Sequence, residues 1–176
     1  MKKGKLFKVC CAAVFAALIC IFTFAFPVPL PNKGYFNFGD CFIIVAALCL
    51  GPVFGGLAAG IGAGLADLIL GYTYYAPATF VIKWLMVVAC WLIYKAFLKL
   101  NKKLGILGII VGAIIAEIVM ILGYFLFEIP LYGLGVAIAD IIGNATQGAI
   151  GAVSGSLLFI VLEKTGAVKK LFRGQK

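Results

Sequence analysis

The sequence predicts an all-α integral membrane protein with six transmembrane helices and both termini in the cytoplasm. Of its 176 residues, 65% are hydrophobic and only 12% are charged, a composition too apolar for a soluble domain. The apolar residues form runs of membrane-spanning length, separated by short connections rich in Gly, Pro and Tyr. No polar stretch is long enough for a second domain. We therefore expect one membrane domain over residues 1–176.

The spans follow one another closely along the chain. The first begins among lysines and ends at Pro27; it is long and lacks a small-x-small site before "PVPLP", which favours a retained span over a cleaved signal peptide. The second is short and must end at the tight "GP" of Gly51–Pro52, where the third starts. The expected spans are residues 6–26, 38–50, 52–70, 77–95, 105–127 and 138–162.

The basic residues give the orientation. All of them except Lys33, in the first outer connection, and Lys83, inside a span, fall at one set of span ends. Cytoplasmic loops carry the excess of Lys and Arg, so this side is inside and the protein lies in the cell membrane. The connections "PVPLPNKGYFNFG", "GYTYYA" and "EIPLYGLGV" then face outward.

Several function classes are excluded or disfavoured. The net charge of +9 resides in clusters at span ends and does not form a nucleic-acid surface. The chain has no His, six Cys without CxxC spacing and no GxxxxGK[ST] loop, so neither metal binding nor ATP hydrolysis is expected. We expect no enzyme activity and no cofactor.

Charged groups within spans mark candidate sites. At 1.5 Å per residue, Lys83 lies about 9 Å below the start of the fourth span and Asp67 about 6 Å below the end of the third. The short turn between these spans makes them neighbours, so Asp67 is the expected partner of Lys83, with Asp40 a second structural charge. Either the lysine is purely structural, or it lines a polar cavity and donates to a ligand.

Polar and aromatic side chains gather near the same outer side. Asp140, Asn144 and Gln147 share one face of the sixth span, which must face protein or a cavity. The aromatic residues form either an interfacial belt or a stacking pocket for a flat heterocycle, and the sequence does not separate the two. They include Trp84, Tyr124 and the loop residues Tyr35, Tyr74, Tyr75 and Tyr132.

Small residues repeat at four-residue spacing in the first span. Ala12 with Ala16, and Ala13 with Ala17, let another helix approach closely. These pairs either pack within the protein or form a smooth face for a second membrane protein.

The run "GYFNFGDCFIIVAALCLGPVFGGLAAGIGAGLADLILGYTYYAPATFVIKW" resembles the substrate-binding S components of energy-coupling factor (ECF) vitamin transporters. The matching elements are "FNFGD", the short second span into "GP", "ADLILGY" and "APATFVIK". Within these transporters the group associated with vitamin B6 and hydroxymethylpyrimidine is the most similar.

The resemblance implies a subunit that binds a vitamin or precursor in an outward cavity capped by loops. It implies partners as well: a transmembrane scaffold, contacted by the alanines of the first span, and two ATP-binding cassette ATPases that consume the ATP. By position it assigns substrate binding to Asn37, Lys83, Trp84, Asp140, Asn144 and Gln147, and we add Tyr124 as a stacking residue.

Three alternatives remain open at this stage. Riboflavin or another vitamin could be the substrate of the same kind of subunit. An autonomous transporter could use Glu117 or Asp140 as a proton relay. A membrane scaffold without a ligand would tolerate loss of Lys83.

Overall fold

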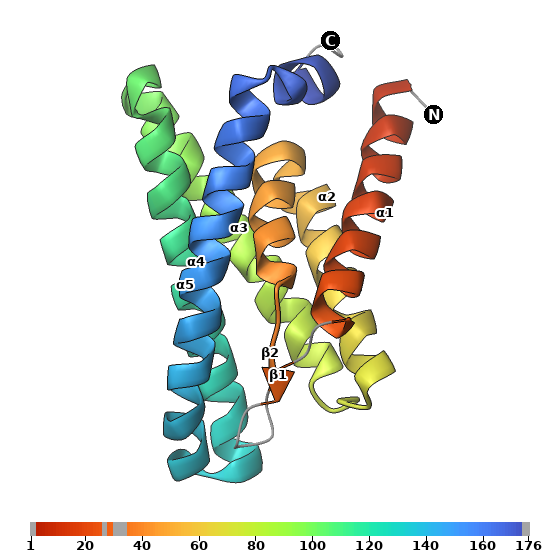
Figure 1. Ribbon diagram of the computed structural model, residues 1–176, viewed down its shortest axis with the longest axis vertical. Coiled ribbons are helices and arrows are strands. Elements are labelled where there is room, and N and C mark those ends of the chain that lie inside the picture. The colour runs from red at the N-terminus through yellow and green to blue at the C-terminus, as the bar shows by residue number, and fades with distance from the viewer. Residues whose placement is uncertain (1–2, 26–27, 30–34, 174–176) are drawn as a thin grey trace.

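The protein is a bundle of long apolar helices, as the sequence predicts (Figure 1). The structure is a computed structural model that describes residues 3–25, 28–29 and 35–173. Five helices in this part are long and apolar enough to cross a membrane. They are α1 (Lys3–Phe24), α2 (Gly39–Leu70), α3 (Ala76–Leu100), α4 (Gly105–Tyr132) and α5 (Leu134–Lys164).

Gly51 divides α2 into two halves, at the place where the sequence predicts the second and third spans to meet. Its φ of 75° and ψ of −172° are not helical, and a positive φ is a conformation that glycine adopts far more readily than other residues. Pro52 follows as the first residue of the second half, where its missing N–H costs nothing. Figure 1 shows the two halves running side by side in opposite directions.

The connections at the far end from the termini are shorter than the sequence suggests. Gly71, with a φ of 84°, ends α2, and its N–H and that of Tyr72 bond back to the last turn. The prediction that "EIPLYGLGV" forms a loop is wrong. The helix α4 continues through Pro130, and Gly133 alone separates it from α5. The helix persists because the N–H of Gly133 still bonds to the carbonyl of Ile129 at 2.9 Å.

The connection between α1 and α2 contains two short strands. β1 (Val28–Pro29) pairs antiparallel with β2 (Tyr35–Phe36). The expected outer lysine, Lys33, lies outside the described residues.

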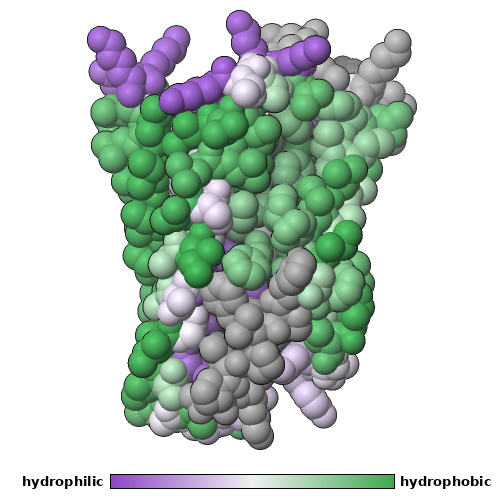
Figure 2. Space-filling view, in the orientation of Figure 1, coloured by the Kyte–Doolittle hydropathy of each residue, from purple (hydrophilic) through white to green (hydrophobic). Residues whose placement is uncertain are grey.

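The helices pack in sequence order, and α2 also contacts α5. This arrangement leaves α1 at the edge of the bundle: 11% of its apolar stretch is buried, against 33% to 61% in the other four helices. The remaining elements are short turns, η1 (Lys102–Leu104) and η2 (Lys169–Arg173). Figure 2 shows that the visible face of the bundle is largely hydrophobic, with hydrophilic residues gathered at the end where Figure 1 places both termini.

Candidate functional site

A buried ion pair between α2 and α3 lies at the centre of the candidate site. The ammonium of Lys83 donates to Oδ1 of Asp40 at 2.5 Å, and the two side chains are 3% and 1% exposed. The partner is therefore Asp40, and the predicted pairing of Lys83 with Asp67 is wrong. The first turn of α2 reaches the depth of Lys83 from the opposite direction and brings Asp40 to the lysine.

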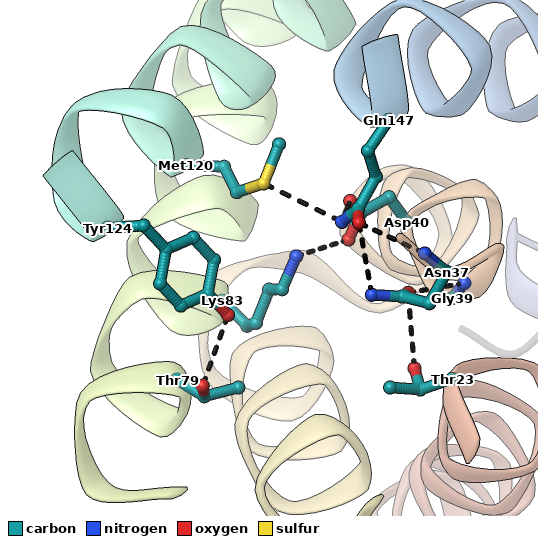
Figure 3. Close-up of polar contacts among 9 residues, drawn as sticks. All are labelled: Thr23, Asn37, Gly39, Asp40, Thr79, Lys83, Met120, Tyr124 and Gln147. Carbon is teal, nitrogen blue, oxygen red and sulfur yellow. Dashed lines mark hydrogen bonds and ion pairs between the residues drawn. The ribbon is translucent and has the colours of Figure 1, made fainter. Parts of the chain in front are cut away.

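A hydrogen-bond network extends the ion pair across the bundle (Figure 3). The amide nitrogen of Gln147 donates to the second oxygen of Asp40 at 2.6 Å. The amide oxygen of the same side chain accepts from the backbone N–H and the side-chain amide of Asn37, at 3.0 and 3.2 Å. One glutamine thus connects the start of α2 to α5 and satisfies both ends of its amide.

Asn37 also fixes the entrance to α2. Its side-chain oxygen accepts from the N–H of Gly39 at 2.9 Å, the local turn that Asn forms before a helix. Thr23, at the end of α1, donates to the same oxygen at 3.4 Å. A β-carbon at residue 39 would collide with the Thr23 hydroxyl, so the glycine is required where α1 approaches.

Tyr124 of α4 closes the other side of the lysine. The ammonium of Lys83 lies 5.6 Å from the centre of its ring, within the range of a cation–π interaction. The phenol oxygen is 3.1 Å from the hydroxyl of Thr79. All five helices therefore contribute to one polar network inside the bundle.

A small polar cavity lies next to this network, and its lining includes Tyr72 and Tyr75 of the connection between α2 and α3. Figure 1 shows this connection at the end of the bundle away from the termini. The volume of the cavity is about 40 Å³, which is room for about three water molecules. Its lining combines carboxyl, amide, hydroxyl and phenol groups from α2 to α5 and the adjoining turns: Asn37, Asp67, Tyr72, Tyr75, Thr79, Tyr124, Glu128 and Asn144.

Tyr75 covers part of this cavity. Its phenol donates to Glu128 at 3.3 Å, and its ring stacks on Tyr132 with centres 6.3 Å apart. Burial, then the nearby Glu128 charge, raises the pKa of the Tyr75 phenol, so the group remains a donor. By contrast, Tyr74 is 82% exposed. The side chain of Tyr35 lies outside the described part of the chain.

The expected substrate-binding residues separate into three groups. Asn37, Tyr124 and Asn144 line the cavity. Lys83, Gln147 and Asp140 are buried, and the first two belong to the network beside the cavity. Trp84 packs elsewhere: its ring lies against Gly56 of α2 and 5.6 Å from Phe80. Successive residues of a helix point about 100° apart, so Lys83 and Trp84 could not face the same space.

Thr79, Tyr72 and Glu128 line the cavity although the sequence analysis does not assign them to the site. Thr79 is four residues before Lys83 and so shares its helix face, a signal that the sequence contains. Asp67, expected as a purely structural charge, also lines the cavity.

Glu117 lies near the middle of α4 and faces α5. A β-carbon at Gly151 would meet its carboxylate at 2.6 Å, and one at Gly148 would meet its β-carbon at 3.0 Å. Neither carboxylate oxygen has a hydrogen-bond partner among the described residues.

The four small residues of α1 lie along an apolar groove between α1 and the second half of α2. Ala12, Ala13, Ala16 and Ala17 all line it, opposite Phe54, Leu57 and Ile61. The backbone of Ala16 also touches Gly62 of α2. The face therefore packs internally at Ala16, while Ala13 and Ala17 are exposed.

Comparisons with known proteins agree with this architecture. Residues 3–164 match the model of the family described as ECF-type riboflavin transporter, S component. A curated protein of Pyrococcus woesei, described as an uncharacterized protein in gap 3'region, is 36% identical over 148 residues, which are 83% of this chain and 95% of the relative. A solved structure, described as "Structure and mechanism of the S component of a bacterial ECF transporter", superposes with a TM-score of 0.64. It covers 92% of this chain and 98% of its own at 24% identity, and we take from it the fold alone.

Proposed function

Since the chain belongs to the family of ECF-type riboflavin transporter S components, we propose that it captures a small heterocyclic vitamin or vitamin precursor outside the cell for ATP-driven uptake. It is a substrate-binding subunit and a multi-pass protein of the cell membrane, and it is not an enzyme.

We propose six membrane spans with both termini in the cytoplasm. The reversal at Gly51 supports counting the two halves of α2 as separate spans. The exposed lysines of the described chain support the orientation, because they lie in α1, in the last turns of α3, in η1, at the end of α5 and after it. These segments meet at the end of the bundle where the termini lie (Figure 1), and cytoplasmic ends are the lysine-rich ones.

The cavity beside Tyr75 and Tyr124 is the observation that carries the substrate proposal. It opens in the outer half of the bundle in this orientation, it is polar, and two of its walls are aromatic. Specific small-molecule sites combine apolar or aromatic walls with a few convergent polar groups. A single flat ring would stack on Tyr75 or Tyr124 and bond to Asn37 and Asn144.

We favour a pyridoxine-like or hydroxymethylpyrimidine-like substrate, with riboflavin as the second candidate because the family description names it. A cavity with room for about three water molecules is too small for either kind of compound, so binding requires Tyr75 or the outer turns to move. One ring requires less displacement than the three fused rings of a flavin.

Lys83, Gln147 and Asp40 then act as positioning residues. They hold Asn37 and Tyr124, which line the cavity, through the hydrogen bonds and the cation–π contact described above. No cofactor of its own enters this proposal, because the ATP is used by partner subunits.

We propose that the groove along Ala12, Ala13, Ala16 and Ala17 receives a helix of the transmembrane scaffold, which carries two ATP-binding cassette ATPases. The groove is apolar and lined by small side chains, the surface on which helices approach closely in lipid. Its position on the least buried helix leaves it accessible within the membrane.

Native mass spectrometry of the detergent-purified chain, without added ligand, tests the proposal. A co-purifying heterocycle that is released on denaturation, and is lost in Asn144→Ala, would support it and identify the substrate. A ligand-free protein that also binds none of the B vitamins or their precursors would overturn it.

A further inference from the structure

The segment after α5 turns back to contact α1 at the end of the bundle where the termini and the exposed lysines lie. Gly166 has a φ of 77°, a conformation that glycine adopts readily, and there the chain turns from α5 toward η2. Val168 is buried in the core, and the ring of Phe172 lies 6.0 Å from that of Phe7 in α1. The segment η2 therefore bridges α5 and α1 (Figure 1).

An apolar slot lies on the membrane side of this bridge. Residues of α1 from Cys10 to Leu18 line one side of it, and Cys49, Leu162 and Leu171 are among the residues opposite. Every residue that lines the slot is either apolar or a cysteine, and its volume is about 320 Å³. The slot separates α1 from the end of α5.

The length of the slot suits the acyl chain of a lipid. From Cys10 to Leu18 the helix rises by about 12 Å at 1.5 Å per residue. One leaflet contributes roughly 15 Å to the hydrocarbon core of a bilayer, so an acyl chain could follow the slot for most of its depth. A second helix fits less well, because it is about 10–12 Å wide with its side chains and the bridge of Phe7 and Phe172 closes one end of the slot.

A basic depression adjoins the slot at the bridge. It has a volume of about 440 Å³ and shares Phe172 and two other lining residues with the slot. Lys8 of α1 and Lys95 of α3 both line this depression and are exposed. The ammonium of Lys95 lies 5.8 Å from the centre of the Trp91 ring, which lines the same depression. Tryptophan and lysine are the side chains expected at the level of lipid headgroups.

The sequence around this depression adds no negative charge. Residues 1–39, 95–116 and 164–176 contain no Asp or Glu, so the undescribed residues at both ends of the chain contribute no acid. Glu163 lines a neighbouring depression together with Lys102 and Lys103, and it is not among the residues that line this one. A basic depression continuous with an apolar slot is complementary to an anionic phospholipid.

We propose that one anionic phospholipid binds at this place, with an acyl chain in the slot between α1 and α5 and its phosphate group at Lys8 and Lys95. The site has no lining residue in common with the substrate cavity, so the proposal goes beyond the proposed function and is independent of the substrate. A bound lipid would fill the space beside α1, the least buried of the five helices.

Native mass spectrometry of the full-length chain tests the proposal. The chain, purified in detergent, is supplied with equal amounts of dioleoylphosphatidylglycerol and dioleoylphosphatidylcholine, which have the same acyl chains but differ in net charge. We expect one phosphatidylglycerol to be retained per chain, with a preference of about 30-fold. Each lysine near a membrane surface strengthens the binding of anionic lipids by about fivefold, and two lysines line the site.

Variants assign the preference to the site. Lys8→Gln/Lys95→Gln removes both charges and should reduce the preference to near unity. Lys5→Gln/Lys99→Gln removes two exposed charges from the same two helices, at positions that line neither the slot nor the depression, and should leave the preference intact. Val14 lines the slot, so Val14→Phe places a ring there and should reduce retention of both lipids. Thermal unfolding verifies that each variant is folded.

Four results would overturn the proposal. They are retention of neither lipid, equal retention of both lipids, and equal loss in the two double variants, which would indicate a diffuse attraction to the whole basic surface. The fourth uses glycerol phosphate, which has no acyl chain: binding of this compound that depends on Lys8 and Lys95 but is unaffected by Val14→Phe would indicate a site for free phosphate. All four leave the substrate-binding function standing, because its own test detects a heterocycle.

Discussion

Lys83 and Asp40 are 43 residues apart in sequence, yet the ammonium and the carboxylate meet at 2.5 Å in the centre of the bundle. The pair joins the first turn of α2 to α3, and Gln147 joins both to α5. The ion pair and the hydrogen bond from Gln147 thus connect three helices beside the cavity. The pair contributes to the stability of the fold only when both partners are present, because either charge alone would be buried without a counter-ion.

Removing only the lysine should therefore be severe. Lys83→Met leaves Asp40 buried and without its counter-ion, which we expect to reduce the free energy of unfolding by about 3–5 kcal/mol. The double variant Lys83→Met/Asp40→Asn removes both charges, keeps an acceptor for the amide of Gln147 and should recover most of that loss. Thermal unfolding in detergent measures both. A single variant as stable as the wild type would show that the pair does not hold the helices together.

The position of Lys83 illustrates what could be predicted from the sequence and what could not. Its depth in the membrane follows from counting residues, and the need for a carboxylate partner follows from the cost of a buried charge. The identity of that partner depends on how α2 folds back at Gly51, because both Asp40 and Asp67 reach a similar depth on this hairpin. Counting residues along one helix does not tell how that helix is rotated about its axis. Nor does it tell which half of α2 lies next to Lys83.

The same distinction holds elsewhere in the site. The spacing of Asn144 and Gln147 correctly predicts an inward-facing stripe on α5, because a helix period relates the two directly. The sequence does not distinguish a Trp84 that contacts a ligand from one that packs against a neighbouring helix. Only the structure shows that its ring lies against Gly56 of α2. The small cavity itself, and the place of Thr79 in it, depend on the joint packing of four helices.

The glycine face of α5 provides a second prediction. A β-carbon at Gly151 would lie 2.6 Å from the Glu117 carboxylate and 2.9 Å from the β-carbon of Asp40, so Gly151→Ala should be destabilising by about 1–3 kcal/mol. Gly135→Ala in the same helix meets nothing within 4 Å and should be neutral or stabilising by about 0.5–1 kcal/mol. Equal melting temperatures for the two variants would mean that α5 does not pack closely against Glu117.

A substitution of Glu117 distinguishes an S component of an ATP-driven importer from an autonomous proton-coupled transporter. Glu117→Gln preserves the shape of the side chain and removes its ability to carry a proton. For an S component we expect ligand affinity to be unchanged and stability to shift by no more than about 1 kcal/mol, because neither carboxylate oxygen has a hydrogen-bond partner among the described residues. Abolition of uptake in cells by this variant, with binding intact, would favour a proton relay instead.

The raised pKa of Tyr75 predicts that the stability of the protein decreases at alkaline pH. Burial and the charge of Glu128 raise the pKa of its phenol above the ordinary value of 10.0, so above that pH the folded state retains a proton that the unfolded chain loses. The contribution of this tyrosine to stability is therefore complete below about pH 10. It decreases as pH rises further, by at most about 1.4 kcal/mol per pH unit. Thermal unfolding of the wild type and Tyr75→Phe at pH 9 to 11 measures the difference, and parallel pH profiles for the two would refute the assignment.

Substitutions in the groove on α1 should weaken binding of the scaffold subunit without changing the affinity for the ligand. Ala13 and Ala17 are exposed along this groove, and a larger side chain at either position would keep a second helix at a distance. We expect Ala13→Leu and Ala17→Leu to reduce co-purification of the scaffold and ATPase subunits by at least about tenfold, as loss of a central interface contact does.

Val14 of the same helix provides the matched control. It is 59% exposed and borders a different depression, on the side of Cys10 and Leu18, so Val14→Leu adds bulk outside the alanine groove and should leave the complex intact. Ligand affinity, measured on the isolated chain, should be unchanged in all three variants, because α1 contributes no residue to the lining of the cavity. If Val14→Leu disrupts the complex and the alanine variants do not, the scaffold approaches from the opposite face of α1. Loss of ligand binding in the alanine variants would instead mean that α1 controls the cavity through Thr23, its contact with Asn37.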